Sequence, residues 1–159
     1  MFIIGDKVVH PMHGAGIISS IVREKINGMY HDYYVFTMPM NGLVLKIPVE
    51  NIDMIGIRPI DSREQVEAVF LSFPELPTEM DSNWNRRYRE NLEQLKSGDL
   101  LRVASVIKGL MCRDSRRGLS TGERKMLYIA KQIMISEVSL VEDMDYKTVE
   151  QRINTAVRA

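Results

Sequence analysis

The local sequence pattern of this chain changes near Pro59, and the change limits the folds that it can adopt. Before Pro59, short β-branched and aromatic runs alternate with glycine-containing turns; after it, apolar residues recur every three or four positions between helix caps. One helical bundle or one β-sandwich cannot produce both patterns. The sequence therefore predicts an α+β chain of two domains, residues 1–58 and residues 59–159.

The first of these domains is predicted to be a small β-barrel. Short strands are expected at residues 7–10, 16–22, 29–36 and 43–48. Asn27-Gly28 precedes the third strand and Asn41-Gly42 the fourth, and Asn-Gly pairs are typical of tight hairpin turns. Strands this short cannot make a wide sheet, so we expect an SH3-like or Tudor-like barrel.

The second domain is predicted to be all-α, with about five helices. The first begins at Asp61 or Ser62 and ends at Pro74. The expected caps of the next three are Ser82, Asp99 and Ser120, the last in the capping box Ser120-Thr121-Gly122-Glu123. A final helix is expected over residues 145–157.

Composition and motifs exclude several classes of protein. The chain is 45% hydrophobic and 26% charged, as globular proteins are, and no apolar stretch approaches the roughly 20 residues of a membrane span. Neither a secretory leader nor a partner for the single Cys112 is evident, so we expect a cytoplasmic protein without membrane contact. His10 and His13 lack a third metal ligand, and Gly14-Ala15-Gly16 precedes a strand rather than a helix. We therefore expect no enzyme, metal, cofactor or small-molecule substrate.

Charge is balanced over the whole chain but not along it. Formal net charge is zero, yet residues 81–135 hold 12 of the 21 basic residues and only 6 of the 21 acidic ones. Such a block is typical of a phosphate-binding surface, although helical domains also carry solvated charge in this way. Arg113, Arg116 and Arg117, expected in a loop before the capping box, share this ambiguity with Arg124 and Lys125 in the helix after it.

The single tryptophan, Trp84, lies in this block beside Arg86, Arg87 and Arg89. Trp84, Tyr88, Leu92 and Leu95 form one stripe at helical spacing, which favours a core position. However, Trp84 falls in the first turn, where its ring can project beyond the stripe, and the arginines beside it are unsuited to an apolar core. Core packing and an exposed ring therefore remain alternatives.

Several segments resemble the CarD/CdnL family of bacterial transcription regulators. They are residues 82–92, residues 95–99, Arg117-Gly118-Leu119-Ser120 and residues 123–127. The start, residues 5–14, is similar to the N-terminal module of that family, which is shared with the transcription-repair coupling factor. The resemblance covers nearly the whole chain in the same order.

This resemblance implies an RNA polymerase-binding Tudor-like domain, residues 1–58, and a DNA-binding helical domain. Polymerase contact, to the β subunit, is implied for Lys46 and for the neighbouring Arg23, Glu24 and Lys25; some relatives have arginine where Glu24 stands. Trp84 would enter the DNA minor groove at the upstream edge of the transcription bubble. The phosphate contacts implied are Arg86, Arg87, Arg89, Arg124 and Lys125. We expect a monomer, although the sequence does not fix the oligomeric state, and an association with the nucleoid through polymerase.

The mechanism that follows is stabilisation of the promoter open complex. Inserting an indole costs less where strands are already parting, so the protein should favour opened DNA with little sequence specificity. The alternative is an adaptor that binds polymerase through both domains, with the arginines facing solvent and no direct DNA contact. Neither alternative determines whether a given promoter is activated or repressed.

Overall fold

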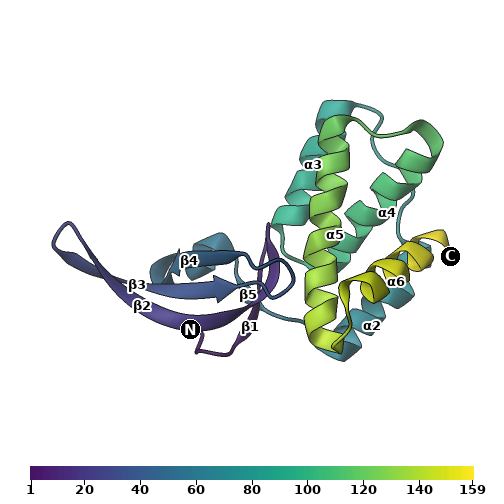
Figure 1. Cartoon of the computed structure of the whole chain (residues 1–159). Coiled ribbons are helices and arrows are strands. Elements are labelled where there is room, and N and C mark those ends of the chain that lie inside the picture. The colour runs from purple at the N-terminus through teal and green to yellow at the C-terminus, as the bar shows by residue number, and fades with distance from the viewer.

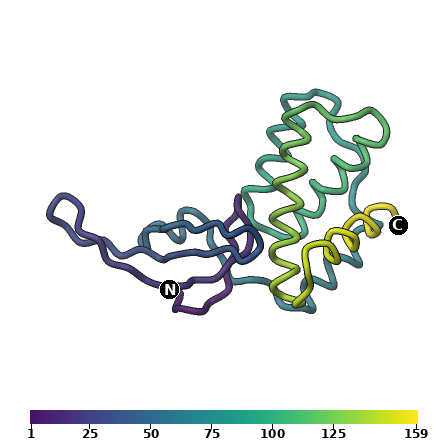
Figure 2. Tube along the Cα trace, in the orientation of Figure 1, coloured from purple at the N-terminus to yellow at the C-terminus, as the bar shows by residue number.

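The computed structural model describes residues 1–159, and its N-terminal part is one antiparallel sheet (Figures 1 and 2). The strands are β1 (Lys7–His10), β2 (Gly14–Ile26), β3 (Met29–Thr37), β4 (Val44–Pro48) and β5 (Arg58–Pro59), in the order β4-β3-β2-β1-β5. The four predicted strands are confirmed, and β5 is additional. Because β4 and β5 each pair with one neighbour only, the ladder is open, and the SH3-like or Tudor-like barrel stays a prediction.

The β2–β3 hairpin gives the sheet two unlike faces. Its turn has positive φ at both Asn27 (51°) and Gly28 (79°), which the predicted tight hairpin turn requires. One face carries Ile18, Tyr34 and Phe36, all buried. The opposite face carries exposed apolar side chains near the hairpin tip, and Figure 1 shows this long ribbon projecting away from the rest of the molecule.

The remaining chain is helical. The helices are α1 (Ile52–Ile55), α2 (Arg63–Ser72), α3 (Trp84–Lys96), α4 (Leu100–Arg117), α5 (Thr121–Glu142) and α6 (Tyr146–Arg158), with 3-10 turns at Val49–Asn51 and Phe73–Glu75. There are six α-helices because the short α1 lies before Pro59; α2 to α6 are the five expected after it. Their apolar faces enclose 20 buried residues. No helix combines the length and apolar character that crossing a bilayer demands.

Most predicted helix starts are confirmed by cap hydrogen bonds. Ser62 and Ser120 each form a capping box, and Asp99 caps α4. The prediction of Ser82 is wrong: Asn83 is the cap, its extended backbone directing the side-chain oxygen to the Arg86 amide at 3.0 Å.

Two charged and two small residues join the sheet to the helices. Arg58, on β5, donates to both carboxylate oxygens of Glu137 on α5, each at 2.8 Å, and Glu137 is completely buried. The Ala15 amide donates to Ser136 Oγ at 2.8 Å. A Cβ on Gly14 would lie 2.3 Å from that oxygen, so only glycine allows β2 to approach α5 this closely. We call Gly14, Arg58, Ser136 and Glu137 the joint.

Candidate nucleic-acid interface

Trp84 is exposed but not free to rotate. Its side chain retains 42% of its accessible surface, so the core alternative left open by periodicity is wrong. The indole stacks on Tyr88 with ring centroids 5.0 Å apart and planes 17° from parallel. Its Nε1 donates to Ser120 Oγ at 3.0 Å. Stacking and this hydrogen bond hold the ring at the start of α3.

The hydrogen bond to Ser120 brings the first turns of α3 and α5 together. The Ser120 hydroxyl also accepts from the Glu123 amide at 3.2 Å, which caps α5, so one oxygen serves both helices. Figure 1 shows α3 and α5 lying side by side with these starts at the same end. The chain thereby presents one aromatic ring beside two helix N-termini, where backbone N–H groups favour anions.

Arg87 lies beneath this surface. It retains 3% exposure, and its Nε donates to Glu123 Oε2 at 2.7 Å while Nη1 donates to the Asp81 carbonyl at 3.0 Å. Burial alone would raise the pKa of Glu123, but the hydrogen bond and charge of Arg87 outweigh it, and the pKa is lowered. The expectation that Arg87 faces outward to phosphate is wrong, because this pair satisfies and buries its charge.

The other predicted phosphate contacts are exposed. Arg86 lies 3.4 Å from Asp81, and Arg124 lies 3.7 Å from Asp114, both as loose surface pairs. Arg89 and Lys125 form no ion pair. Surface pairs of this kind contribute at most about 1 kcal/mol, so their arginines can exchange a carboxylate for a phosphate at little cost.

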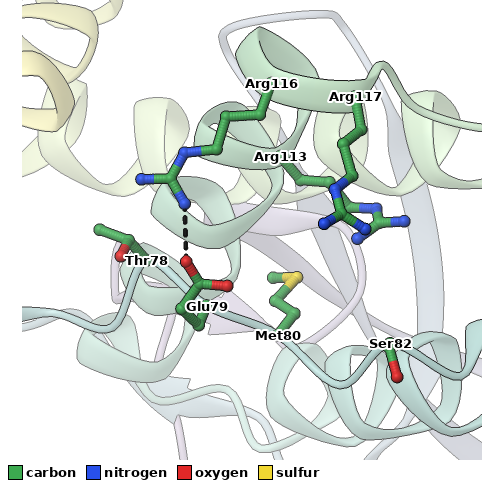
Figure 3. Close-up of a pocket in the computed structure, with 7 residues that line it drawn as sticks. All are labelled: Thr78, Glu79, Met80, Ser82, Arg113, Arg116 and Arg117. Carbon is green, nitrogen blue, oxygen red and sulfur yellow. Dashed lines mark hydrogen bonds and ion pairs between the residues drawn. The ribbon is translucent and has the colours of Figure 1, made fainter.

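The three arginines expected in the loop before the capping box instead end α4. Arg113, Arg116 and Arg117 are helical, because α4 continues to Gly118, whose positive φ of 76° ends it. Arg116 donates to Glu79 at 2.8 Å (Figure 3). They therefore lie on a different helix from Arg86 and Arg124.

The predicted polymerase contacts lie on β2 and β4 but not on one face: by strand register Glu24 and Lys46 share one face of the sheet, and Arg23 and Lys25 alternate to the other. Glu24 and Lys46 form an exposed ion pair across the sheet, and Arg23 pairs with Asp32 at 2.9 Å. The hydrogen bond that Arg23 donates lowers the pKa of the Asp32 carboxyl. Lys25 Nζ lies 5.6 Å from the centre of the Tyr30 ring. The charge of Lys46 is therefore already compensated within this chain.

The joint is the feature that sequence reasoning missed. Glu137 stands among Ile133, Met134, Ile135 and Val138, all buried, and a carboxylate at such a position demands a partner. That signal was present in the sequence, but the identity of the partner, Arg58, depends on the packing of the sheet against α5.

Comparison with known proteins gives the chain its family. Residues 68–154 match the family model for the CarD C-terminal domain, and residues 2–61 match the model for the CarD-like/TRCF RID domain. A protein of Bacillus subtilis (strain 168) named "Putative transcription factor YdeB" is 31% identical over 150 residues, which cover 94% of this chain and 98% of that protein.

The chain belongs to the CarD/CdnL family. The expected resemblance is thereby confirmed. In this CarD-family chain, the RID match contains the whole sheet, and the C-terminal match contains α3 to α5 with Trp84.

Proposed function

We propose that this chain is a transcription regulator that binds RNA polymerase through its sheet and promoter DNA through the starts of α3 and α5. Trp84 acts as a wedge in the minor groove at the upstream edge of the bubble and slows its closure. The observation that carries the proposal is the indole itself: exposed, stacked on Tyr88 and held by Ser120 among unburied cations. A preorganised ring loses little conformational entropy on insertion, which favours binding.

Four cations support the DNA part of the proposal: Arg86, Arg89, Arg124 and Lys125. All four side chains are exposed; Arg86 and Arg89 lie on α3, which begins with Trp84, and Arg124 and Lys125 lie in the first turn of α5. Arg87 is left out of the proposed contacts, since it supports Trp84 from below. Because the indole N–H is already bonded to Ser120, the ring has no donor with which to read a base edge.

The sheet supports the polymerase part. By strand register, Ile26, Met29 and Val44 share the face that carries Glu24 and Lys46, opposite the buried one. Their side chains are 44%, 66% and 57% exposed. Exposed apolar residues beside charged ones are typical of protein-binding surfaces. We propose that this face binds the polymerase β subunit.

Open-complex decay tests the DNA part. Trp84→Ala should shorten the lifetime of a polymerase–promoter open complex at least about fivefold, corresponding to about 1 kcal/mol of lost stabilisation. The loss of fold stability should stay below about 1.5 kcal/mol, because the ring is partly exposed. Tyr128→Ala is the matched control: it removes an exposed aromatic ring on α5 and should leave the lifetime unchanged.

Polymerase binding separates the proposal from the adaptor alternative. Met29→Ser should weaken binding to polymerase, whereas Leu71→Ser, at an even more exposed apolar position on α2, should not. If Trp84→Ala keeps the wild-type open-complex lifetime while Met29→Ser abolishes binding, the chain is an adaptor without DNA contact.

A further inference from the structure

A recess at the end of α4 contains cations that the proposed function does not use. Its volume is about 160 Å³ (Figure 3). It lies between α4 and the segment that leads from the 3-10 turn at Phe73–Glu75 to α3. The side chains that matter are Arg113, Arg116, Arg117, Thr78, Glu79 and Ser82.

The helix itself brings the three arginines together. Arg113, Arg116 and Arg117 are spaced i, i+3 and i+4, so they occupy one face of α4, with neighbouring Cβ atoms about 5–6 Å apart. Together with Glu79 they give the recess a formal charge of +2. The C-terminal end of a helix contributes only about half a negative charge, so the recess as a whole attracts anions.

Hydrogen-bonding capacity in the recess is not used up. Arg113 Nε is buried without a partner, and Arg117 forms no ion pair. Arg116 is bonded to Glu79 at 2.8 Å, but the Glu79 side chain is 85% exposed, so this pair is held weakly. Figure 3 shows Arg113 and Arg117 reaching toward the segment with Met80 and Ser82, while Arg116 reaches toward Glu79.

We propose that this recess binds a terminal phosphate group, which replaces the Glu79 carboxylate at Arg116. Guanidinium groups bind phosphate oxygens in pairs, and Thr78 and Ser82 line the same recess. A recess favours a terminal phosphate over a diester, whose sugars flank it on both sides. The group could belong to a free phosphorylated compound or to the end of a nucleic acid strand.

Phosphate binding in the recess would also affect the segment that leads into α3. The Asp81 and Ser82 carbonyls accept from Arg87, and Asn83 caps α3 directly before Trp84. A phosphate that ties this segment to α4 would therefore reduce its mobility beside the indole. The phosphate site itself does not rest on the DNA role of Trp84.

Titration of the full chain with pyrophosphate tests the site. We expect saturable NMR shifts of the amides of residues 78–82 and of the Arg113 and Arg117 Nε–H groups, at constant ionic strength with chloride as the competing ion. Arg117→Ala should weaken binding about tenfold, since it removes charge-assisted hydrogen bonds. Glu79→Gln should strengthen binding, since it removes the competing carboxylate.

Arg102→Ala is the matched control, because Arg102 is an exposed arginine in the first turn of the same helix. Non-saturating shifts, or equal affinities for Arg117→Ala, Glu79→Gln and Arg102→Ala, would overturn the proposal. Displacement of pyrophosphate by a 5′-phosphorylated strand but not by its unphosphorylated twin assigns the site to strand ends. Displacement by neither assigns it to a free compound. The titration contains no polymerase and does not involve Trp84. Its result therefore does not depend on whether Trp84→Ala changes open-complex decay.

Discussion

Arg87 and Glu123 stand 36 positions apart and form a buried ion pair under the exposed indole. Arg87→Ala leaves Glu123 buried without its partner, which should cost about 3–5 kcal/mol of unfolding free energy. Replacing both residues, as in Arg87→Met with Glu123→Leu, should cost less. Guanidinium-induced unfolding measures both, and a cost below 1 kcal/mol for Arg87→Ala would contradict the burial described.

Arg86, one position earlier, should behave in the opposite way. Its exposed contact with Asp81 contributes little to stability, so Arg86→Ala should change the unfolding free energy by less than about 1 kcal/mol. In DNA binding, however, loss of one phosphate contact should lower the slope of log affinity against log salt by about one. An unchanged slope would remove Arg86 from the proposed phosphate contacts.

Ser120 is predicted to control the orientation of Trp84. Ser120→Ala removes the acceptor for Nε1 and the cap of α5, with an expected stability cost of about 1 kcal/mol. The only tryptophan of the chain should then show lower fluorescence anisotropy. Ser120→Thr, which keeps the hydroxyl, should restore it. Equal anisotropy in all three proteins would show that Tyr88 alone fixes the ring.

The lowered pKa of His10 leads to a prediction of how stability depends on pH. Burial, reinforced by the charge of His13, lowers its pKa to about 4. Between pH 4 and 6.5 the unfolded chain binds the proton that the folded chain excludes, so stability should be fully present above pH 6.5 and decrease toward pH 4. His10→Asn should flatten the curve of unfolding free energy within that window. A curve unchanged from wild type would assign the dependence to other groups.

The residue scale also shows where sequence reasoning fails. Spacing favours a core position for Trp84, and its place in the first turn only allows the exposure that the structure shows. The opposite fate of Arg87 does not follow, because its partner Glu123 comes from another helix. Local spacing identifies the face of a helix, whereas long-range pairing decides which charges on it are buried.

At the scale of elements, local signals performed better. The caps Ser62, Asp99 and Ser120 and the Asn27-Gly28 turn depend on hydrogen bonds within a few residues, so the sequence alone predicts them. The predicted end of α4 is wrong, since a basic run before Gly118 fits a loop as well as a last helical turn. Whether the sheet closes depends on pairing between its distant edges, which no local signal encodes.

The β1–β2 turn supplies a prediction at this scale. Gly14→Ala would place a Cβ against Ser136 at a φ of 113°, so the strand must move away from α5. Gly28→Ala is the matched control: its φ is also positive, but nothing lies within 4 Å of the added carbon. In urea unfolding Gly14→Ala should cost clearly more than the strain of about 1–2 kcal/mol expected for Gly28→Ala. Equal costs in the two variants would show that β2 can move away from α5 without loss of stability.

At the scale of the whole molecule, the joint fixes the sheet relative to the helices. Arg58 and Glu137 satisfy each other in a buried setting, so the relative orientation of the two parts has one favoured value. If polymerase binds one part and DNA the other, that orientation determines where the indole arrives. Sheet and helices could each be predicted from sequence; their relative placement could not, because it depends on contacts such as Ala15 to Ser136, 121 positions apart.

The consequence is mechanical. Glu137 lies near the far end of α5 from Ser120, 17 positions away, or about 25 Å at a rise of 1.5 Å per residue. A rotation of about 10° at the joint would swing the indole through roughly 4 Å, more than the 3.4 Å between successive base pairs. The helix is thus a lever arm: if the proposed DNA contact forms, the stiffness of the ion pair between Arg58 and Glu137 decides which base step the ring meets.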